Sequence, residues 1–196
     1  MQTLTRGRIV LAEDDPLVRQ DFREMLLQLG YDVVAEAADG ASAIHLVRTL
    51  RPDVALLEVE MPGLDGLKVT KAISAAELAP VLLVSGCSEW ESVRRASEAG
   101  AAAYLVKPVT ERKLFAAIEL ARERFRAALA LRRKIDALRD EAEMERLLHR
   151  AKVLIMADFE VGEAEAQQRI QSLAAKSRKS LKEAAGAVLL AARARA

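Results

Sequence analysis

Residues 9–19 read IVLAEDDPLVR, and this stretch decides the fold. Four apolar residues, 9–12, are followed at once by three acids, a proline and the start of a helical pattern. Asp15 is placed to cap that helix, and Pro16 suits its first turn. A short, continuous apolar run before a helix is typical of a strand in a parallel sheet that is covered on both faces.

The same strand-then-helix unit recurs along the first 120 residues. The expected strands are the short apolar runs 9–12, 33–37, 54–57, 81–84 and 104–106. The segments between them have helical spacing, as in Val18, Phe22 and Leu26, which lie on one face. This alternation predicts an α/β fold: a doubly wound, five-stranded parallel sheet with helices on both sides.

Polar residues follow four of the five expected strands. In chain order they are Glu13, Asp14, Asp15, Glu58, Ser85 and Lys107. Because ligands of such sheets bind beyond the carboxyl ends of the strands, we expect these side chains to share one pocket. Crowded carboxylates need a cation, and Mg²⁺ prefers oxygen ligands. A lysine and a hydroxyl suit phosphoryl oxygens, so the pattern predicts phosphoryl transfer onto a carboxylate.

Residues 7–120 resemble the receiver domain of bacterial response regulators, a flavodoxin-like fold. The segments that carry the resemblance are IVLAEDDPLVR, PDVALLEVEMPGLDG, VLLVSG and AGAAAYLVKPV. It implies a Mg²⁺ site made by Glu13, Asp14, Glu58 and the backbone carbonyl of Glu60, with Glu58 at the phosphoacceptor position. It also implies that Ser85 and Tyr104 are switch residues, that Lys107 contacts phosphate, and that the Lys107–Pro108 bond is cis.

The acceptor in this family is Asp, whereas the sequence has Glu58. One extra methylene moves the carboxylate by about 1.5 Å, and a misplacement of about 1 Å can slow an in-line transfer roughly 10²-fold. We therefore expect inefficient phosphorylation and weakened Mg²⁺ binding. Two interpretations stay open: Glu58 mimics the phosphorylated state and the protein is constitutively active, or a partner protein controls a receiver retained for docking.

The second half of the chain differs in charge and pattern. Residues 1–119 hold 13 Lys/Arg and 18 Asp/Glu, a net charge of −5, whereas residues 120–196 hold 17 and 11, a net charge of +6. From Glu111 onward the sequence has high helical propensity. Within it, apolar positions recur with gaps of 3 and 4: Ala121, Phe125, Ala128, Leu131, Ile135, Leu138 and Ala142. This seam indicates a coiled-coil homodimer; the alternative is a helix packed on its own receiver.

Residues 149–189, HRAKVLIMADFEVGEAEAQQRIQSLAAKSRKSLKEAAGAVL, complete a small three-helix α domain and resemble the ANTAR domain, an RNA-binding module of transcription antiterminators. The pattern places Ile170, Leu173 and Ala174 inward on the second helix. This sequence departs from the family pattern at Val153, Glu160 and Ala175. The expected division is a receiver domain (1–120), a coiled-coil linker (121–148) and an ANTAR-like domain (149–196).

The resemblance implies that a dimer binds tandem stem-loops in leader transcripts. It also implies that a ligand-sensing regulatory protein or a histidine kinase controls this binding. Phosphate contacts are expected from the basic residues Arg169, Lys176, Arg178, Lys179 and Lys182. RNA loops are usually read by bases that stack on aromatic rings or on Arg. Phe159 is the aromatic residue that this module offers, so Arg would have to do much of that stacking.

Other classes of function are less well supported. A DNA-binding response regulator would need a recognition helix with several base-reading side chains, and the last helix is rich in alanine. A protein-interaction adaptor is the third alternative. Outside the strand-end cluster no residues have catalytic spacing, so we expect no enzyme. One cysteine, Cys87, and the lack of a long apolar run favour a cytoplasmic protein that does not enter membranes.

Overall fold

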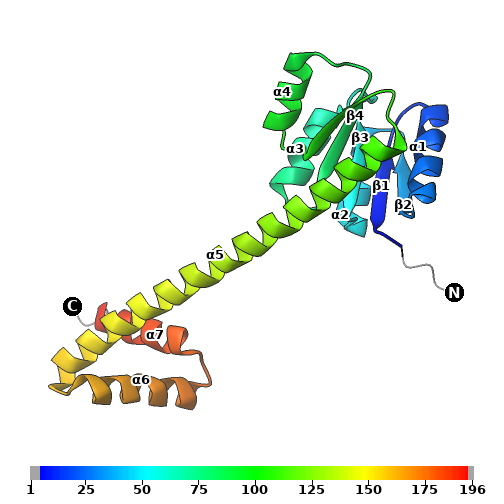
Figure 1. Cartoon of the computed structure of the whole chain (residues 1–196). Coiled ribbons are helices and arrows are strands. Elements are labelled where there is room, and N and C mark those ends of the chain that lie inside the picture. The colour runs from blue at the N-terminus through cyan, green and yellow to red at the C-terminus, as the bar shows by residue number, and fades with distance from the viewer. Residues whose placement is uncertain (1–4, 194–196) are drawn as a thin grey trace. The chain divides into compact units, whose positions relative to one another are not determined.

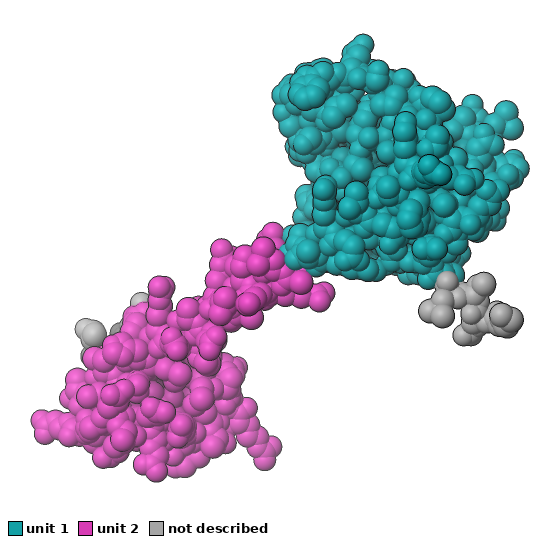
Figure 2. Space-filling model, viewed as in Figure 1, with its two compact units in different colours: residues 1–128 teal, residues 129–196 magenta. Residues whose placement is uncertain are grey.

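The computed structural model describes residues 5–193, with the side chain of Arg193 left out. The chain divides into two compact units, residues 1–128 and 129–196 (Figure 2). The first unit alternates strands and helices (Figure 1). Its elements are β1 (Arg8–Ala12), α1 (Pro16–Gln28), β2 (Asp32–Ala37), α2 (Gly40–Leu50), β3 (Val54–Glu58), α3 (Gly66–Ala75), β4 (Val81–Ser85), α4 (Trp90–Glu98) and β5 (Ala103–Val106), followed by the start of α5 (Glu111–Phe159).

The five strands form one parallel sheet in the order β2-β1-β3-β4-β5. Each expected strand is present within one residue of its predicted bounds. The strand order reverses between β1 and β3, which is where doubly wound sheets open a crevice at their carboxyl ends. The α/β fold class predicted from the sequence is therefore confirmed, and so is the expected cis bond at Lys107–Pro108.

Two apolar layers cover the sheet. On one face, Val10, Leu57 and Leu83 pack against α2, α3 and α4, and on the other, Leu11, Leu56 and Leu82 pack against α1 and the first turns of α5. Neighbouring residues of a strand point to opposite faces, so near-continuous apolar strands fill both layers. Side chains of both layers are almost fully buried, and this core fixes the strand ends that carry the polar cluster.

The second unit is helical and contains the rest of α5 with α6 (Glu163–Ser177) and α7 (Leu181–Arg193). Small residues let the helices approach closely: its core holds Ala151, Ile155, Ala166, Ile170, Ala174, Ala184 and Ala185. Ser180 and Glu183 cap α7 reciprocally, because Ser180 Oγ accepts from the Glu183 amide at 3.2 Å and Glu183 Oε2 accepts from the Ser180 amide at 2.8 Å. The expected inward position of Leu173 is wrong: its side chain is 39% exposed.

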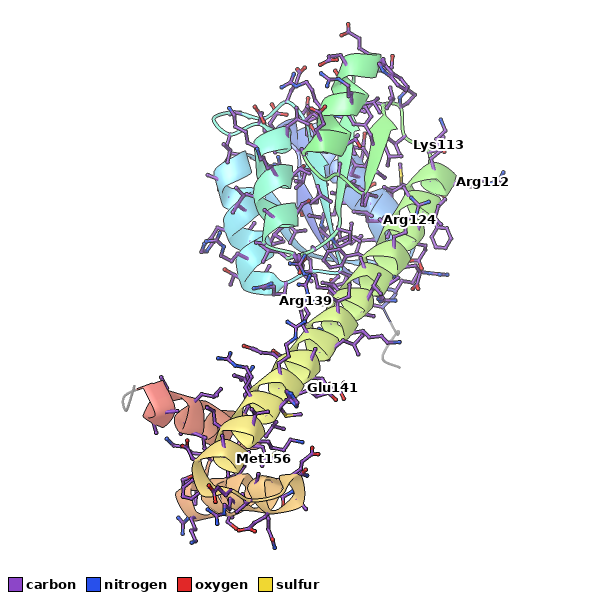
Figure 3. The ribbon with its side chains drawn as sticks, turned by 90° about the vertical axis from the view of Figure 1, so that its left-hand side faces the viewer. Arg112, Lys113, Arg124, Arg139, Glu141 and Met156 are labelled. Carbon is purple, nitrogen blue, oxygen red and sulfur yellow. The ribbon has the colours of Figure 1, made fainter. Side chains whose placement is uncertain are left out.

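Apolar side chains in the middle of α5 are largely exposed in the part of the chain that the structure describes. Leu131 is 61% exposed, Ile135 41% and Leu138 55%. They alternate with charged side chains that also face solvent, among them Arg139 and Glu141, which Figure 3 labels on this helix. Within the described residues, no helix is long and apolar enough to cross a bilayer.

Candidate functional site

Residues at the carboxyl ends of β1, β3 and β5 form one cluster. Glu13 follows β1 directly and Glu58 ends β3; the two residues are only 2% and 6% exposed. Lys107 follows β5, where its Nζ donates to Glu13 Oε2 at 2.8 Å and forms an ion pair with Glu58. A hollow of about 540 Å³ lies over the cluster and is also lined by Asp14 and Glu60. The structure thus brings these five predicted residues together.

The longer side chain of Glu58 turns back onto its own loop. Its Oε1 accepts hydrogen bonds from the backbone amides of Val59 at 2.8 Å and Glu60 at 3.3 Å. Its Oε2 faces Lys107. Both oxygens of the carboxylate therefore have protein groups as partners. Gly66 holds this loop close, because a Cβ at this first residue of α3 would clash with the Glu58 carbonyl oxygen.

The charges of the cluster are coupled. Burial raises the pKa of Glu13, and the hydrogen bond from Lys107 opposes that rise. Burial alone would lower the pKa of Lys107, but the hydrogen bonds to Glu13 and Glu58 raise it instead. Lys107 consequently keeps its positive charge at neutral pH and partly neutralises two buried carboxylates.

Receiver domains generally bind Mg²⁺ at this end of the sheet, but here the ion would compete with Lys107 for the same carboxylates. Mg²⁺ demands near-octahedral oxygen coordination, yet Glu13 and Glu58 already bind the Lys107 ammonium. The side chains of Asp14 and Glu60 are exposed. In residues 5–193, no group of three or more acidic, histidine or cysteine side chains could hold a metal ion. As arranged, Lys107 supplies the positive charge that the carboxylates require.

Ser85 and Tyr104 meet the same backbone segment. Ser85 Oγ accepts from the Cys87 amide at 3.1 Å, and the Tyr104 hydroxyl donates to the Cys87 carbonyl at 2.8 Å. Both side chains therefore fix the loop between β4 and α4. Their roles as switch residues stay predictions. Cys87 was not placed at this site from the sequence, because a role carried by backbone atoms leaves no signal in residue type.

Arg19 also supports the cluster and was not singled out from the sequence. Its Nη1 donates to the Glu13 carbonyl at 2.6 Å, and its Nε lies 3.5 Å from Glu36 Oε2. Arg19, a residue of α1, thus holds the loop after β1 in place. Asp15, two residues after Glu13, caps α1 as predicted, because it accepts from the amides of Leu17 and Val18.

In the second unit, the structure divides the five predicted RNA-contacting cations into two groups. Arg169 pairs with Glu165 at 2.8 Å, and Lys182 pairs with Glu143 at 2.6 Å. The other three, Lys176, Arg178 and Lys179, are exposed and form no hydrogen bond or ion pair through their side chains with the described residues. These three surround the connection between α6 and α7. Whether any of the five contacts RNA is untested and stays a prediction.

The positions that depart from the ANTAR pattern are accommodated. Glu160, which follows α5 directly, adopts a left-handed backbone with φ of 53°. Val153 is 50% exposed, and Ala175 is also at the surface. The helices on both sides of Glu160 are formed, so the turn keeps a geometry that glycine would adopt more easily.

Comparison with known proteins assigns a family to each part of the chain. The family described as "Response regulator receiver domain" matches residues 9–119, and the ANTAR domain family matches residues 136–189. The first match includes the acidic cluster, and the second includes the cations of α6 and of the connection to α7.

Similar proteins are regulators. The transcriptional regulatory protein PdtaR of Mycobacterium tuberculosis is 38% identical over 182 residues, which are 93% of this chain and 89% of that protein. The probable transcriptional regulatory protein NarL of the same species is 41% identical over 113 residues, 57% of this chain and 52% of that protein. The solved receiver domain of that NarL has a TM-score of 0.57 and 37% identity, covering 61% of this chain and 98% of that structure.

Proposed function

Because this chain belongs to the response regulators that carry a receiver domain and an ANTAR domain, we propose that it is an antiterminator that binds tandem RNA stem-loops in leader transcripts. Both domains are regulatory and neither is an enzyme. We propose the division expected from the sequence: a receiver over residues 1–120, a linking helix over 121–148 and an RNA-binding domain over 149–196.

The observation that carries the RNA-binding proposal is the charge at the end of α6. From residue 166 to residue 182 the sequence has five cations and no acid. Of these, Lys176, Arg178 and Lys179 have no side-chain ion pair among the described residues, so binding a phosphate would break none. Exposed cations without an ion pair at one connection add little to the stability of the fold, and they are available to contact a phosphate backbone.

We propose that the receiver does not work by efficient phosphorylation. Glu58 already takes up the Lys107 ammonium and two backbone amides, which are the donors that a phosphoryl group at this place would need. The favoured mode is control by a ligand-sensing partner that docks on the receiver. The second candidate, constitutive activity, is supported by the same contacts, because a carboxylate bound to Lys107 and to backbone amides would resemble a phosphoryl group in its charge and its donors.

We also propose a homodimer through α5. Leu131, Ile135 and Leu138 follow one another at gaps of 4 and 3 and are exposed in the single chain. A second copy would bury these side chains in a knobs-into-holes seam. Two RNA-binding domains would then be available for two stem-loops.

The decisive experiment measures binding of the full chain to three probes: a tandem-hairpin RNA from a leader transcript, a single hairpin from it, and duplex DNA of the same sequence. We expect binding to the tandem RNA, with a slope of log K against log salt of about −2 if three cations contact single-stranded phosphates. Equal affinity for duplex DNA would favour a DNA-binding regulator. No binding to any probe would favour the protein-interaction adaptor.

A further inference from the structure

A hollow of about 450 Å³ lies where the end of α5 meets α6 and α7 in the second unit. Ile155, Leu173 and Val188 give it an apolar wall, and Phe159 and Arg169 line it as well. The Arg169 guanidinium carbon lies 4.6 Å from the centroid of the Phe159 ring. A volume of this size is within the range of small-molecule sites.

Arg169 is held in place before any ligand binds. One side of its guanidinium rests on the Phe159 ring, and Glu165 Oε1 accepts from its Nη2 at 2.8 Å and from its Nε at 3.3 Å. Its side chain nevertheless stays 42% exposed. A planar cation with a fixed orientation and an accessible surface offers a stacking partner at little cost in conformational entropy.

Large apolar side chains lie exposed beside Arg169, and Asp158 is an acid in the same lining. Phe159 is 53% exposed and Leu173 is 39% exposed, although both are large apolar side chains of a small domain. A nucleobase has an apolar face that stacks on an aromatic ring or a guanidinium. Apolar surface beside a fixed guanidinium therefore matches the chemistry of an unstacked base.

Helical spacing connects this hollow to the unpaired cations. Arg169, Leu173 and Lys176 are separated by 4 and 3 residues, so they lie along one face of α6. Lys176 is about 10 Å along the helix from Arg169. A strand whose base enters the hollow would run its phosphates towards Lys176, with Arg178 and Lys179 just beyond.

We propose that this hollow, formed by Phe159, Arg169 and the apolar residues beside them, binds one unstacked base of an RNA loop. The inference rests on the proposed RNA-binding function and adds a base-binding residue set to it. Arg169 stacks on the base, and Phe159 holds the guanidinium from behind. A second copy of the chain is a less suitable occupant, because it would have to bury the ion pair of Arg169 with Glu165.

The test uses the full chain and a hairpin RNA enriched on it from a pool with randomised loops. Affinity is measured over a series of salt concentrations for three variants. Arg169→Lys keeps the charge and removes the plane, Phe159→Leu keeps an apolar side chain and removes the ring, and Lys176→Gln is the matched control for a phosphate contact. Circular dichroism and light scattering verify that each variant keeps its helices and its oligomeric mass.

We expect Arg169→Lys and Phe159→Leu to weaken binding roughly 5- to 100-fold with little change in salt slope. Lys176→Gln should instead make the slope about 0.7 to 0.9 shallower. An abasic nucleotide at one loop position should weaken binding to the wild type strongly and binding to Arg169→Lys only slightly.

Variants that bind the enriched RNA as tightly as the wild type would overturn the base site alone. A change of oligomeric mass in Phe159→Leu would assign the hollow to a second copy. A wild type that enriches no RNA would overturn the proposed function as well.

Discussion

Lys107, which follows β5, forms an ion pair with Glu58, the last residue of β3. The same ammonium donates to Glu13 Oε2 at 2.8 Å. One lysine thus serves two carboxylates that are almost fully buried. An Asp at this position would carry its carboxylate on a side chain about 1.5 Å shorter. The positive charge beside these two carboxylates therefore comes from the protein itself.

Shortening Glu58 should open the site. In Glu58→Asp the carboxylate withdraws from Lys107 and from the backbone amides, and we expect it to accept a phosphoryl group from acetyl phosphate in the presence of Mg²⁺. Intact-mass measurement should show an adduct of one phosphoryl group on Glu58→Asp and none on the wild type. Glu58→Gln, which has no nucleophilic carboxylate, is the control. A wild type that is phosphorylated as fast as Glu58→Asp would refute the proposed loss of phosphorylation.

Removing Lys107 should destabilise the first unit. Lys107→Gln leaves the carboxylates of Glu13 and Glu58 buried without a cation, which we expect to cost about 3 kcal/mol of unfolding free energy. Mg²⁺ should then raise the melting temperature of this variant far more than that of the wild type, because a divalent ion replaces the missing charge. Lys71→Gln, at an exposed position on α3, serves as the control. An equal effect of Mg²⁺ on both proteins would show that Lys107 does not stand in for the metal.

Much of the first unit could be predicted from the sequence because its signals are local. Apolar runs set the strands, and acids at strand ends must converge once the sheet is parallel. The direction of the Glu58 carboxylate could not be predicted in this way. The sequence shows that a glutamate ends this strand, but the direction of its side chain depends on Lys107, which is 49 residues away in the chain. Arg19 was missed for a related reason, since it bonds to a backbone carbonyl.

In the second unit, helical spacing predicted helices but did not show which apolar side chains stay exposed. Leu173 and Ala174 are neighbours on α6, and a helical pattern alone assigns both to one broad inner face. In the structure Ala174 is buried and Leu173 lines the hollow beside Arg169. The small side chain of Ala174 belongs to the core between the helices, whereas the larger Leu173 lies outside it. The contact of Arg169 with Phe159 follows from that packing and has no sequence signal.

A buried tyrosine should make the attachment of α5 sensitive to acid. The Tyr31 hydroxyl donates to Glu119 Oε1 at 2.6 Å, and Arg122 donates to the same oxygen at 2.8 Å. The hydrogen bond from Tyr31, together with that from Arg122, lowers the pKa of Glu119. A lowered pKa in the folded state stabilises the fold above the ordinary pKa of glutamate, about 4.3, and this stabilisation is lost as the pH falls through the folded value.

We therefore expect Tyr31→Phe to lower the unfolding free energy by about 1 kcal/mol at pH 7. The difference from the wild type should shrink as the pH falls below about 4, because Glu119 becomes protonated in both proteins. Urea unfolding at several pH values measures this. Glu123→Gln, which breaks only an exposed pair with Arg126, should change stability little at any pH. A deficit of Tyr31→Phe that does not vary with pH would disprove the coupling.

The exposed seam of α5 should determine the oligomeric state. Ile135→Glu places a charge in the middle of the apolar positions Leu131 and Leu138, so we expect the variant to sediment as a monomer at concentrations where the wild type is a dimer. The monomer should keep its fold, because Ile135 is exposed in the single chain. Lys134→Glu makes a larger change of charge at the neighbouring position and should leave the mass of the assembly unchanged. A wild type that remains monomeric at high micromolar concentration would remove the basis for this proposal.

A glycine in the turn between α5 and α6 should stabilise the second unit. Glu160 has a φ of 53°, a left-handed conformation that strains any residue with a Cβ, whereas glycine adopts it readily. We expect Glu160→Gly to raise the unfolding free energy of the second unit by up to about 1 kcal/mol, measured in the full chain by thermal unfolding. The same replacement at Gln168, an exposed position in the interior of α6, should lower stability by roughly the same amount, because glycine is a poor helix former there. Changes of unfolding free energy with opposite signs at the two positions would show that the effect comes from the backbone conformation. A loss of stability at both would mean that the Glu160 side chain contributes more than its backbone strain costs.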